Sequence, residues 1–404
     1  MASILIREFG PIKSGYTQNN GWMKFSRVTA FCGPQGSGKS CAVKVFSFFS
    51  WLEKVLMRGD HRESVWLRNN KFPREFAEFH NVKEYFRPKT ILRYRGDAYQ
   101  FDWEDGLFMM RRMDADGQSS YSIPKIMYVP AERNFMSVLD AVDQVKSIPP
   151  NLKAVTREFL AACDVFADGI DYPVSGFSFK YDKLNHIGKI KLSDGSEVRL
   201  SAASSGLQSM TPLFLVSEYL YGLLNEDKDA SKDMSLASYK RMFELFFKDV
   251  SLEELPDVLQ QGLSKYSATL IKRFVNVVEE PEQNLYPSSQ QKLLYKLLEY
   301  AKGNEKYSEN QLVLTTHSPY IIEYLRLVAR AAERPTLLDD VVMRKTGLKT
   351  AMLIPWEDMS LYETQRDGSI IESAGSGDGS AFSNPLKTNL DSIVQMQDEM
   401  FPVG

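Results

Sequence analysis

The stretch Gly33-Pro34-Gln35-Gly36-Ser37-Gly38-Lys39-Ser40 fits the phosphate-loop pattern G-x-x-x-x-G-K-[ST] and decides the fold. In this pattern the glycines let backbone N–H groups curl around phosphates, the lysine reaches the β- and γ-phosphate oxygens, and the serine binds Mg²⁺. The sequence therefore predicts that residues 33–40 and the following Cys41 hold the phosphates of ATP, with Lys39 essential and Mg²⁺ on Ser40. The alternative interpretation is an ordinary glycine-rich turn.

The flanking segments agree with a phosphate loop. Residues 25–32 (Phe-Ser-Arg-Val-Thr-Ala-Phe-Cys) are typical of a buried strand, and residues 39–57 have the apolar period of a helix. The partial positive charge at a helix N-terminus favours phosphate anions. A strand, loop and helix in this order predict an α/β fold of the P-loop NTPase class.

Two adjacent carboxylates end another apolar segment, Val275-Asn276-Val277-Val278-Glu279-Glu280-Pro281-Glu282. Burying such a pair without a cation is costly, so a metal ion or a shared proton is expected beside it. In phosphoryl transfer to water, the first acid can hold the Mg²⁺ shell while the second polarises the attacking water. We therefore expect Glu279 to be a metal ligand and Glu280 to be the catalytic base. Without the upstream phosphate loop, an acidic strand end on the surface would be the default explanation of the pair.

A third apolar run ends in Thr315-Thr316-His317-Ser318-Pro319 and contains one of the four histidines of the chain. An isolated histidine is more often structural than catalytic, but this one follows a strand, as the acidic pair does. The carboxyl ends of parallel strands meet at one edge of a sheet, where chemistry is usually found. A neutral imidazole there can hydrogen-bond the γ-phosphate and the attacking water, so we expect His317 to sense ATP.

The remaining elements are less regular. A β-rich insertion should precede a buried strand at residues 126–129, and residues 135–167 are helical by period and are predicted to project as an arm or lid. A hairpin turning at Asp194-Gly195 leads to a Ser-rich loop at residues 201–206 and a helix at 207–224. Further expected features are strands at residues 3–9, 90–94, 99–103 and 107–112, a charged helical insertion at 225–265, a flexible linker at 373–383 and a last short helix.

Composition excludes several classes of protein. The 404 residues are 43% hydrophobic and 25% charged, close to the average for globular proteins, which argues against wholesale disorder. A net charge of −3 does not indicate nucleic-acid binding, so any DNA contact would need a local patch. Residues 58–95, which mix Arg and Lys with aromatic side chains, are the best candidate, although a solvated insertion explains them more simply.

The three cysteines form no C-x-x-C pair, which is expected in a reducing compartment and makes structural zinc improbable. The N-terminal segment lacks the basic stretch and apolar core of a secretion signal. No apolar run approaches the roughly 20 residues that span a bilayer. From the sequence we expect a cytoplasmic protein without a membrane partner.

The order of phosphate loop, Ser/Gly loop before a helix, acidic pair with Pro, and Thr-His-Ser-Pro resembles the ABC-type ATPases of the RecF, SMC and OLD group. The resemblance covers roughly residues 25–325 and implies a mixed sheet core with β-rich and helical insertions. It also implies that Ser204, Ser205 and Gly206 form a signature loop placed on ATP bound to a second subunit, giving ATP-sandwich dimers within a homo-oligomer. A plain helix cap by Ser204 or Ser205 is the alternative for this loop.

The sequence departs from the family pattern at three points. The signature lacks the usual L-S-G-G-Q spelling, and Glu279 stands where Asp is usual, which suggests slow hydrolysis. The region expected to hold the Q-loop, Met127-Tyr128-Val129-Pro130-Ala131-Glu132-Arg133, contains no Gln, so Glu132 and Arg133 are assigned to it. The implied segments are residues 1–134 (first ATPase lobe), 135–265 (arm, hairpin, signature-like loop and helical insertion), 266–330 (second ATPase lobe) and 331–404 (C-terminal strands, linker and tail).

After His317 there is no Asp-x-Asp of the kind that a Toprim nuclease uses to hold metal. An OLD-like ATPase without its nuclease is similar to the ATPase subunits of two-gene anti-phage systems, and the layout is most similar to the AriA-type ATPases of the PARIS system. That resemblance implies a phage-protein trigger and a separate effector, a Toprim nuclease. A RecF-like DNA-repair ATPase and an ATP-stabilised scaffold without significant hydrolysis remain alternatives.

Overall fold

A mixed seven-stranded sheet forms the centre of the computed structural model, which describes residues 2–68, 70–113, 121–139, 145, 147–225, 271–304, 309–337 and 339–373. From β15 to β8 each strand runs parallel to its neighbour, whereas β16 is antiparallel to β15. The strands in sheet order are β2 (Gly15–Tyr16), β16 (Ser369–Glu372), β15 (Met359–Thr364), β4 (Val28–Cys32), β14 (Gln311–Thr315), β13 (Arg273–Glu279) and β8 (Pro124–Val129).

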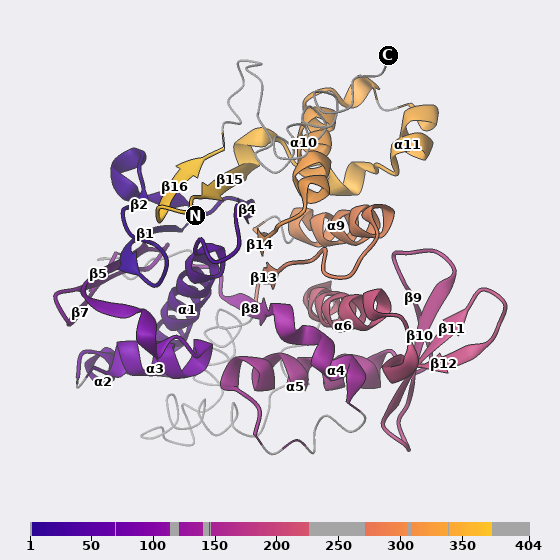
Figure 1. Ribbon diagram of the computed structural model, residues 1–404, viewed down its shortest axis with the longest axis horizontal. Coiled ribbons are helices and arrows are strands. Elements are labelled where there is room, and N and C mark those ends of the chain that lie inside the picture. The colour runs from indigo at the N-terminus through magenta and orange to yellow at the C-terminus, as the bar shows by residue number, and fades with distance from the viewer. Residues whose placement is uncertain are drawn as a thin grey trace, which may run out of the picture.

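Helices cover both faces of this sheet, which explains why its strands are apolar throughout rather than alternating (Figure 1). Successive side chains point to opposite faces: Phe31 packs in the core under α1, while Ala30 and Cys32 join the core on the other side. The first face carries α1 (Lys39–Met57) and α3 (Lys71–His80). The second carries α5 (Pro150–Val165), α6 (Ser205–Asn225), α9 (Pro287–Lys302) and α10 (Pro319–Glu333). Short helices are α2 (Glu63–Trp66), α4 (Phe135–Val138) and α11 (Asp340–Thr346).

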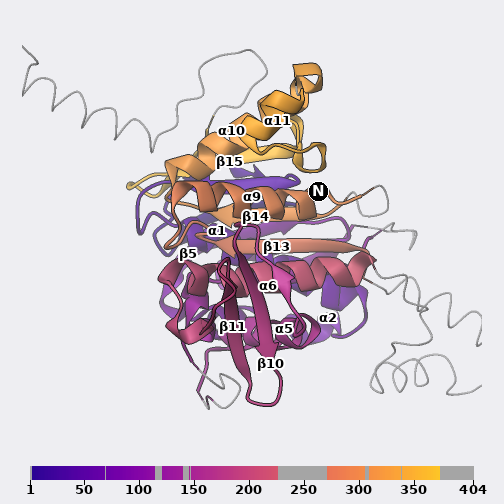
Figure 2. The ribbon, with the colours of Figure 1, turned by 90° about the vertical axis from the view of Figure 1, so that its right-hand side faces the viewer.

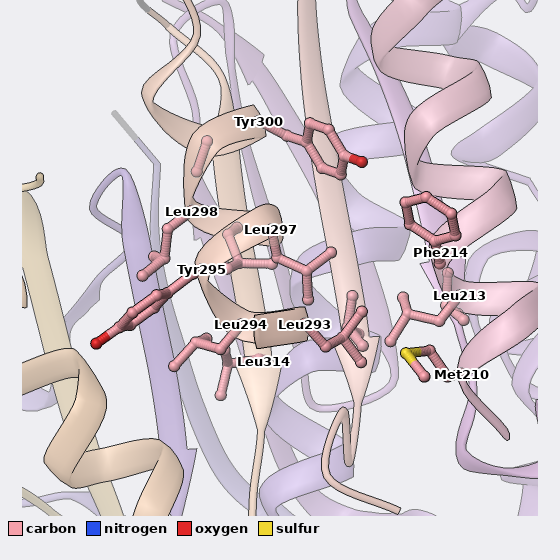
Figure 3. Packing of buried hydrophobic residues seen from close by; sticks show 14 of the residues in the cluster. Met210, Leu213, Phe214, Leu293, Leu294, Tyr295, Leu297, Leu298, Tyr300 and Leu314 are labelled. Atoms are coloured by element: carbon pink, nitrogen blue, oxygen red, sulfur yellow. The ribbon is translucent and has the colours of Figure 1, made fainter. Parts of the chain in front are cut away.

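The core of the second face is built between α6 and α9. Figure 3 shows Leu293 and Leu297 of α9 facing Leu213 and Phe214 of α6, all of which are almost fully buried. Side chains four residues apart lie on one face of a helix, so these leucines form a continuous apolar stripe. Within the described residues, no helix has the length and apolar character that crossing a bilayer requires.

Two antiparallel sheets flank the central one (Figures 1 and 2). One sheet packs on α1 and has the order β3 (Met23–Lys24), β1 (Ser3–Phe9), β5 (Phe86–Arg95), β6 (Tyr99–Glu104) and β7 (Leu107–Arg112). The other lies beside α5 and α6 and has the order β12 (Glu197–Arg199), β11 (Ile187–Leu192), β10 (Phe177–Asp182) and β9 (Ile170–Asp171).

These elements confirm the predicted α/β class with a mixed sheet core and a β-rich insertion. Helix α1 has the predicted bounds, and the hairpin turn places Gly195 at φ +85°, as its sequence requires. The strand predicted at residues 25–32 is shorter and begins at Val28. The insertion at 226–265, the linker from residue 374 and the last short helix lie outside the described residues.

The prediction of a projecting arm at residues 135–167 is wrong for its main helix. Val155, Phe159, Ala162 and Cys163 of α5 are buried in the core of the second sheet face. The helical period that suggested an arm is instead the apolar stripe of a packed helix.

The aromatic residues within 58–95 belong to the core of the first sheet face. Trp66, Phe72, Phe76 and Tyr94 are each about 1% exposed or less. Bases of single-stranded nucleic acid stack on accessible rings, so these four side chains cannot form such a surface. The simpler interpretation of this insertion is therefore favoured.

A buried carboxylate joins α1 to the first flanking sheet. Glu53 is 1% exposed, and its Oε1 accepts hydrogen bonds from the backbone N–H groups of Ala98 (2.7 Å) and Tyr99 (2.9 Å). Its Oε2 accepts one from the Tyr94 hydroxyl at 2.7 Å. Burial raises the pKa of Glu53, and these donors oppose that rise. The carboxylate therefore holds the β5–β6 turn against the helix that follows the phosphate loop.

We predict that Glu53→Ala lowers the free energy of unfolding by about 3 kcal/mol, because two buried N–H groups lose their acceptor. Glu53→Gln is the matched control: its Oε1 can still accept from both N–H groups, so its cost should be clearly smaller. Urea denaturation of the purified variants measures both values. Equal losses for the two variants would contradict the role assigned to the acceptor.

Candidate nucleotide site

The phosphate loop connects β4 to α1. At two of its positions the backbone lies so close to neighbouring atoms that only glycine fits. Gly33 has φ +131°, and a Cβ there would lie 2.3 Å from the carbonyl oxygen of Thr364. Gly38 has φ +104°, and its Cβ would lie 2.6 Å from Cγ1 of Ile12. Only glycine combines these backbone angles with such contacts. The loop is thus seated between β15 and the turn after β1.

Lys39 lies under this loop and is 5% exposed. Its Nζ donates hydrogen bonds to the carbonyl oxygens of Gly33 (2.9 Å) and Pro34 (2.7 Å). Burial lowers the Lys39 pKa to about 8, and the negative charge of Glu280 opposes this effect. The ammonium group is therefore buried among neutral carbonyls, where phosphate anions would stabilise its charge.

The other predicted loop residues differ in exposure. Gln35 and Gly36 are exposed, whereas Pro34 and Ser40 are partly buried. The Cys41 thiol lies in the hydrophobic core, and burial raises its pKa to about 12. The predicted contact of Cys41 with ATP would therefore have to come from its backbone N–H.

A residue that no sequence pattern singles out, Thr364 at the end of β15, supports the loop. Its hydroxyl lies 2.6 Å from the Ser37 hydroxyl and 3.1 Å from the carbonyl oxygen of Cys32, and its single proton can be donated to either of them. Ser37 also donates to the carbonyl of Pro34 at 2.6 Å. Because Thr364 lies 327 positions from Ser37 in the chain, no local motif could have indicated this contact.

The acidic pair divides into one buried and one accessible carboxylate. Glu279 ends β13 and is 5% exposed, and its buried Oε1 makes no hydrogen bond of good geometry among the described residues, although its carboxylate interacts with the Tyr128 hydroxyl. Glu280 adopts φ +45° and leaves 37% of its side chain exposed. Its backbone N–H donates to the Thr315 carbonyl at 3.0 Å, which continues the pairing with β14.

A buried carboxylate oxygen without a hydrogen bond of good geometry fits the predicted role of Glu279 as a ligand of Mg²⁺, a cation that prefers oxygen ligands. Among the described residues, no group of three or more His, Cys, Asp or Glu side chains is arranged to hold a metal ion. Ser40 and Glu279 would therefore need phosphate oxygens and water to complete an octahedral shell, which is how Mg²⁺ usually binds with nucleotides.

His317 faces Glu280 across the edge of the sheet. Its Nε2 lies 3.7 Å from Oε1 of Glu280. Burial lowers the His317 pKa, and the charge of Lys39 lowers it further. The imidazole is therefore neutral at pH 7 and above, and it can donate or accept a hydrogen bond without forming an ion pair. The structure thus brings together Lys39, Glu280 and His317, which are far apart in the sequence.

Glu282 positions the main chain at His317, a role that the sequence did not reveal. Its Oε1 accepts hydrogen bonds from the Thr316 hydroxyl (2.9 Å) and the His317 backbone N–H (2.6 Å). Burial raises the Glu282 pKa, and these two donors oppose the rise. The segment after β13 and the segment after β14 are therefore joined through one side chain.

Arg133 is, with Lys39, a buried cation at this edge of the sheet. It lies in a short 3-10 helix (Ala131–Asn134) after β8 and is fully buried, whereas Glu132 is exposed. Its guanidinium donates to the carbonyls of Glu279 (2.6 Å), Glu280 (2.7 Å), Ser209 (3.0 Å) and Pro130 (3.3 Å). Burial lowers its pKa to about 10, so Arg133 remains charged at pH 7. The sequence assigned both Glu132 and Arg133 to the Q-loop region. Of these two residues, Arg133 makes the hydrogen bonds to the carbonyls of Glu279 and Glu280.

The signature-like loop lies at the start of α6. Ser204 and Ser205 are exposed, and a Cβ at Gly206 would approach the carbonyl oxygen of Asn284 to 2.8 Å. Within one chain the loop therefore packs beside the segment that follows the acidic pair. The predicted contact of these three residues with ATP on a second subunit stays a prediction.

Comparison with known families agrees with this site. Residues 261–322 match the AAA ATPase domain. The matched segment contains the acidic pair, Glu282 and His317. With the phosphate loop and the parallel sheet, it supports the predicted nucleotide-binding ATPase fold. No curated protein matches the chain.

Solved structures that match this chain include SMC head domains. The SMC head domain from Thermotoga maritima is 13% identical with a TM-score of 0.37, over 93% of this chain and 98% of that chain. An SMC head bound to the C-terminal winged-helix domain of ScpA is 13% identical with a TM-score of 0.37, over 94% and 99%. A head domain with an extended coiled coil, bound to a ScpA domain derived from Pyrococcus furiosus, is 11% identical with a TM-score of 0.35, over 98% and 100%.

We predict that Gly33→Ala destabilises the protein by roughly 3 kcal/mol or more, because its Cβ would meet the main chain of Thr364. Gly36→Ala is the matched control within the same loop: Gly36 has φ +72° but open space around its Cβ position, so only about 1 kcal/mol is expected. Chemical denaturation compares the two. Similar losses would show that the loop does not depend on its contact with β15.

The buried lysine makes nucleotide binding depend on pH. Below pH 8 Lys39 is already charged, so the affinity for ATP should be flat there. Above pH 8 binding must be accompanied by proton uptake, and the affinity should fall by up to about tenfold per pH unit. Isothermal titration calorimetry between pH 7 and about 9.5 measures this slope. Lys39→Arg, which keeps its charge throughout, should bind more weakly without the slope; the same slope in both proteins would contradict the assignment.

Proposed function

We propose that this chain binds MgATP at the phosphate loop and hydrolyses it to ADP and phosphate. The observation that carries the proposal is the position of Glu280 Oε1, 3.7 Å from His317 Nε2, at the strand edge that also holds Lys39. A base, a neutral hydrogen-bonding group and a buried cation are the groups that phosphoryl transfer to water requires.

Each residue has a distinct role in this proposal. Lys39 leaves the carbonyls of Gly33 and Pro34 and neutralises the β- and γ-phosphate oxygens. Glu280, which is accessible, accepts the proton of the attacking water. His317 hydrogen-bonds the γ-phosphate and so distinguishes ATP from ADP. Ser40 and Glu279 hold Mg²⁺, which neutralises phosphate charge when it is bound.

We also propose that turnover needs two subunits. The signature-like loop of Ser204, Ser205 and Gly206, whose two serines are exposed, would complete the site of a second copy and form an ATP-sandwich dimer within a homo-oligomer. Support for this comes from the exposure of the serines and from the order of motifs. Slow turnover is expected because Glu279 reaches one methylene further toward the metal than Asp.

The biological setting that fits the motif order best is anti-phage defence. In this proposal the chain is the ATPase subunit of a two-gene system that senses a phage protein and controls a separate effector, a Toprim nuclease. The supporting observation is the OLD-like order of phosphate loop, Ser/Gly loop, acidic pair and Thr-His-Ser-Pro. The burial of Trp66, Phe72, Phe76 and Tyr94 removes the stacking surface that would have favoured a DNA-repair ATPase.

We predict that Lys39→Ala abolishes ATP binding at micromolar concentrations, whereas Glu280→Gln still binds ATP but turns it over roughly 100-fold or more slowly. Glu357→Gln, the same chemical change on a carboxylate remote from the strand edge, should behave as the wild type. Phosphate release and native mass are measured with and without ATP, DNA and the product of any neighbouring gene.

The outcomes separate the alternatives. Unchanged behaviour of Glu280→Gln beside a wild type without turnover would indicate a scaffold. Turnover that requires DNA and is suppressed by salt would indicate a repair ATPase, because phosphate contacts release counterions. Turnover lost in both site variants, together with a nuclease that co-purifies, is the result expected for the defence ATPase.

A further inference from the structure

The hydrogen bonds of Arg133 go to main-chain carbonyls from three separate segments. Glu279 and Glu280 belong to the end of β13, Ser209 belongs to α6, and Pro130 follows β8. A guanidinium is planar and holds its donors in a fixed fork, so groups bonded to it keep a fixed relative position. Removing the Arg133 side chain would break this connection between the acidic segment and α6.

Two further contacts lie on the same surface between α6 and the acidic segment. The Ser209 hydroxyl donates to Oε1 of Gln283 at 3.1 Å, and Gly206 packs against the carbonyl of Asn284. The first turns of α6 therefore rest on residues 279–284. Since Ser204 and Ser205 lie at the start of these turns, a displacement of the signature-like loop must reach the acidic pair.

The position of Glu280 is sensitive to this attachment. Its φ of +45° is uncommon for a residue with a side chain and costs free energy unless neighbouring contacts enforce it. The Arg133 bond of 2.7 Å to the Glu280 carbonyl and the bond from the Glu280 N–H to Thr315 fix the peptide groups on both sides of that residue. Its carboxylate direction thus depends on Arg133.

We propose that Arg133 is a positioning residue for ATP hydrolysis, which presents the Glu280 carboxylate to the nucleotide and couples it to the seating of α6. This inference rests on the proposed function, in which Glu280 is the base. It goes further by assigning control of that base to a residue outside the phosphate loop, the acidic pair and the signature-like loop.

The test compares Arg133→Met and Arg133→Lys with Arg273→Met. Arg273 is a matched control because it is a largely buried arginine at the opposite end of β13, with 12% of its side chain exposed and Nη2 3.3 Å from Asp97 Oδ2. For each protein we would measure the ATP dissociation constant, kcat, KM and the thermal midpoint, with turnover assayed well below that midpoint.

Arg133→Met should bind ATP within about threefold of the wild type, since Lys39 and the loop are intact, and should lose about 100-fold in kcat. Arg133→Lys should lose roughly tenfold, because an ammonium keeps the charge but lacks the planar fork. Arg273→Met should lower the thermal midpoint while leaving kcat within about twofold of the wild type. A loss confined to kcat distinguishes positioning from general destabilisation.

Two results would overturn the inference, and they can be told apart. If the wild type turns over ATP and Glu280→Gln does not, but Arg133→Met retains its kcat or Arg273→Met loses as much, Arg133 has only a structural role. If the wild type has no turnover that depends on Lys39 and Glu280, the proposed function fails and the inference fails with it.

Discussion

The parallel pairing of β4, β14 and β13 is the constraint on which the site depends. Strands paired in this way end at the same edge, so the phosphate loop, the acidic pair and His317 meet although they lie far apart in the sequence. The register is specific: Glu279 pairs with Thr315, and Thr315 pairs with Phe31. A slip of one residue would turn Glu279 to the opposite face of the sheet.

Buried positive charges lie close to carboxylates at this edge of the sheet. Two cations, Lys39 and Arg133, lie buried near the carboxylates of Glu279, Glu280 and Glu282. Both cations donate to neutral carbonyls, and burial shifts the pKa of each downward. Lys39 is buried against carbonyls, and Oε1 of Glu279 makes no hydrogen bond of good geometry among the described residues. This site is therefore suited to receive a phosphate group together with a divalent cation.

Sequence reasoning found the residues that carry a local pattern and missed those that act at a distance. The phosphate loop, the acidic pair and His317 each follow an apolar strand, and that pattern alone is enough to place them at one edge of a parallel sheet. Thr364 and Glu282 act through contacts between segments, so their roles could not be derived. Arg133 was assigned to the Q-loop region, but its hydrogen bonds to the acidic segment and α6 could not be foreseen. The helical period at residues 150–165 was recognised, but period alone does not tell a packed helix from a projecting one.

The most direct test of the account is a crystal structure of Glu280→Gln with MgATP. The account predicts that Lys39 Nζ has left the carbonyls of Gly33 and Pro34 for the phosphates, with Mg²⁺ on Ser40 and Glu279 and with His317 beside the γ-phosphate. A nucleotide bound elsewhere, or one bound while Lys39 still donates to its own loop, would contradict it.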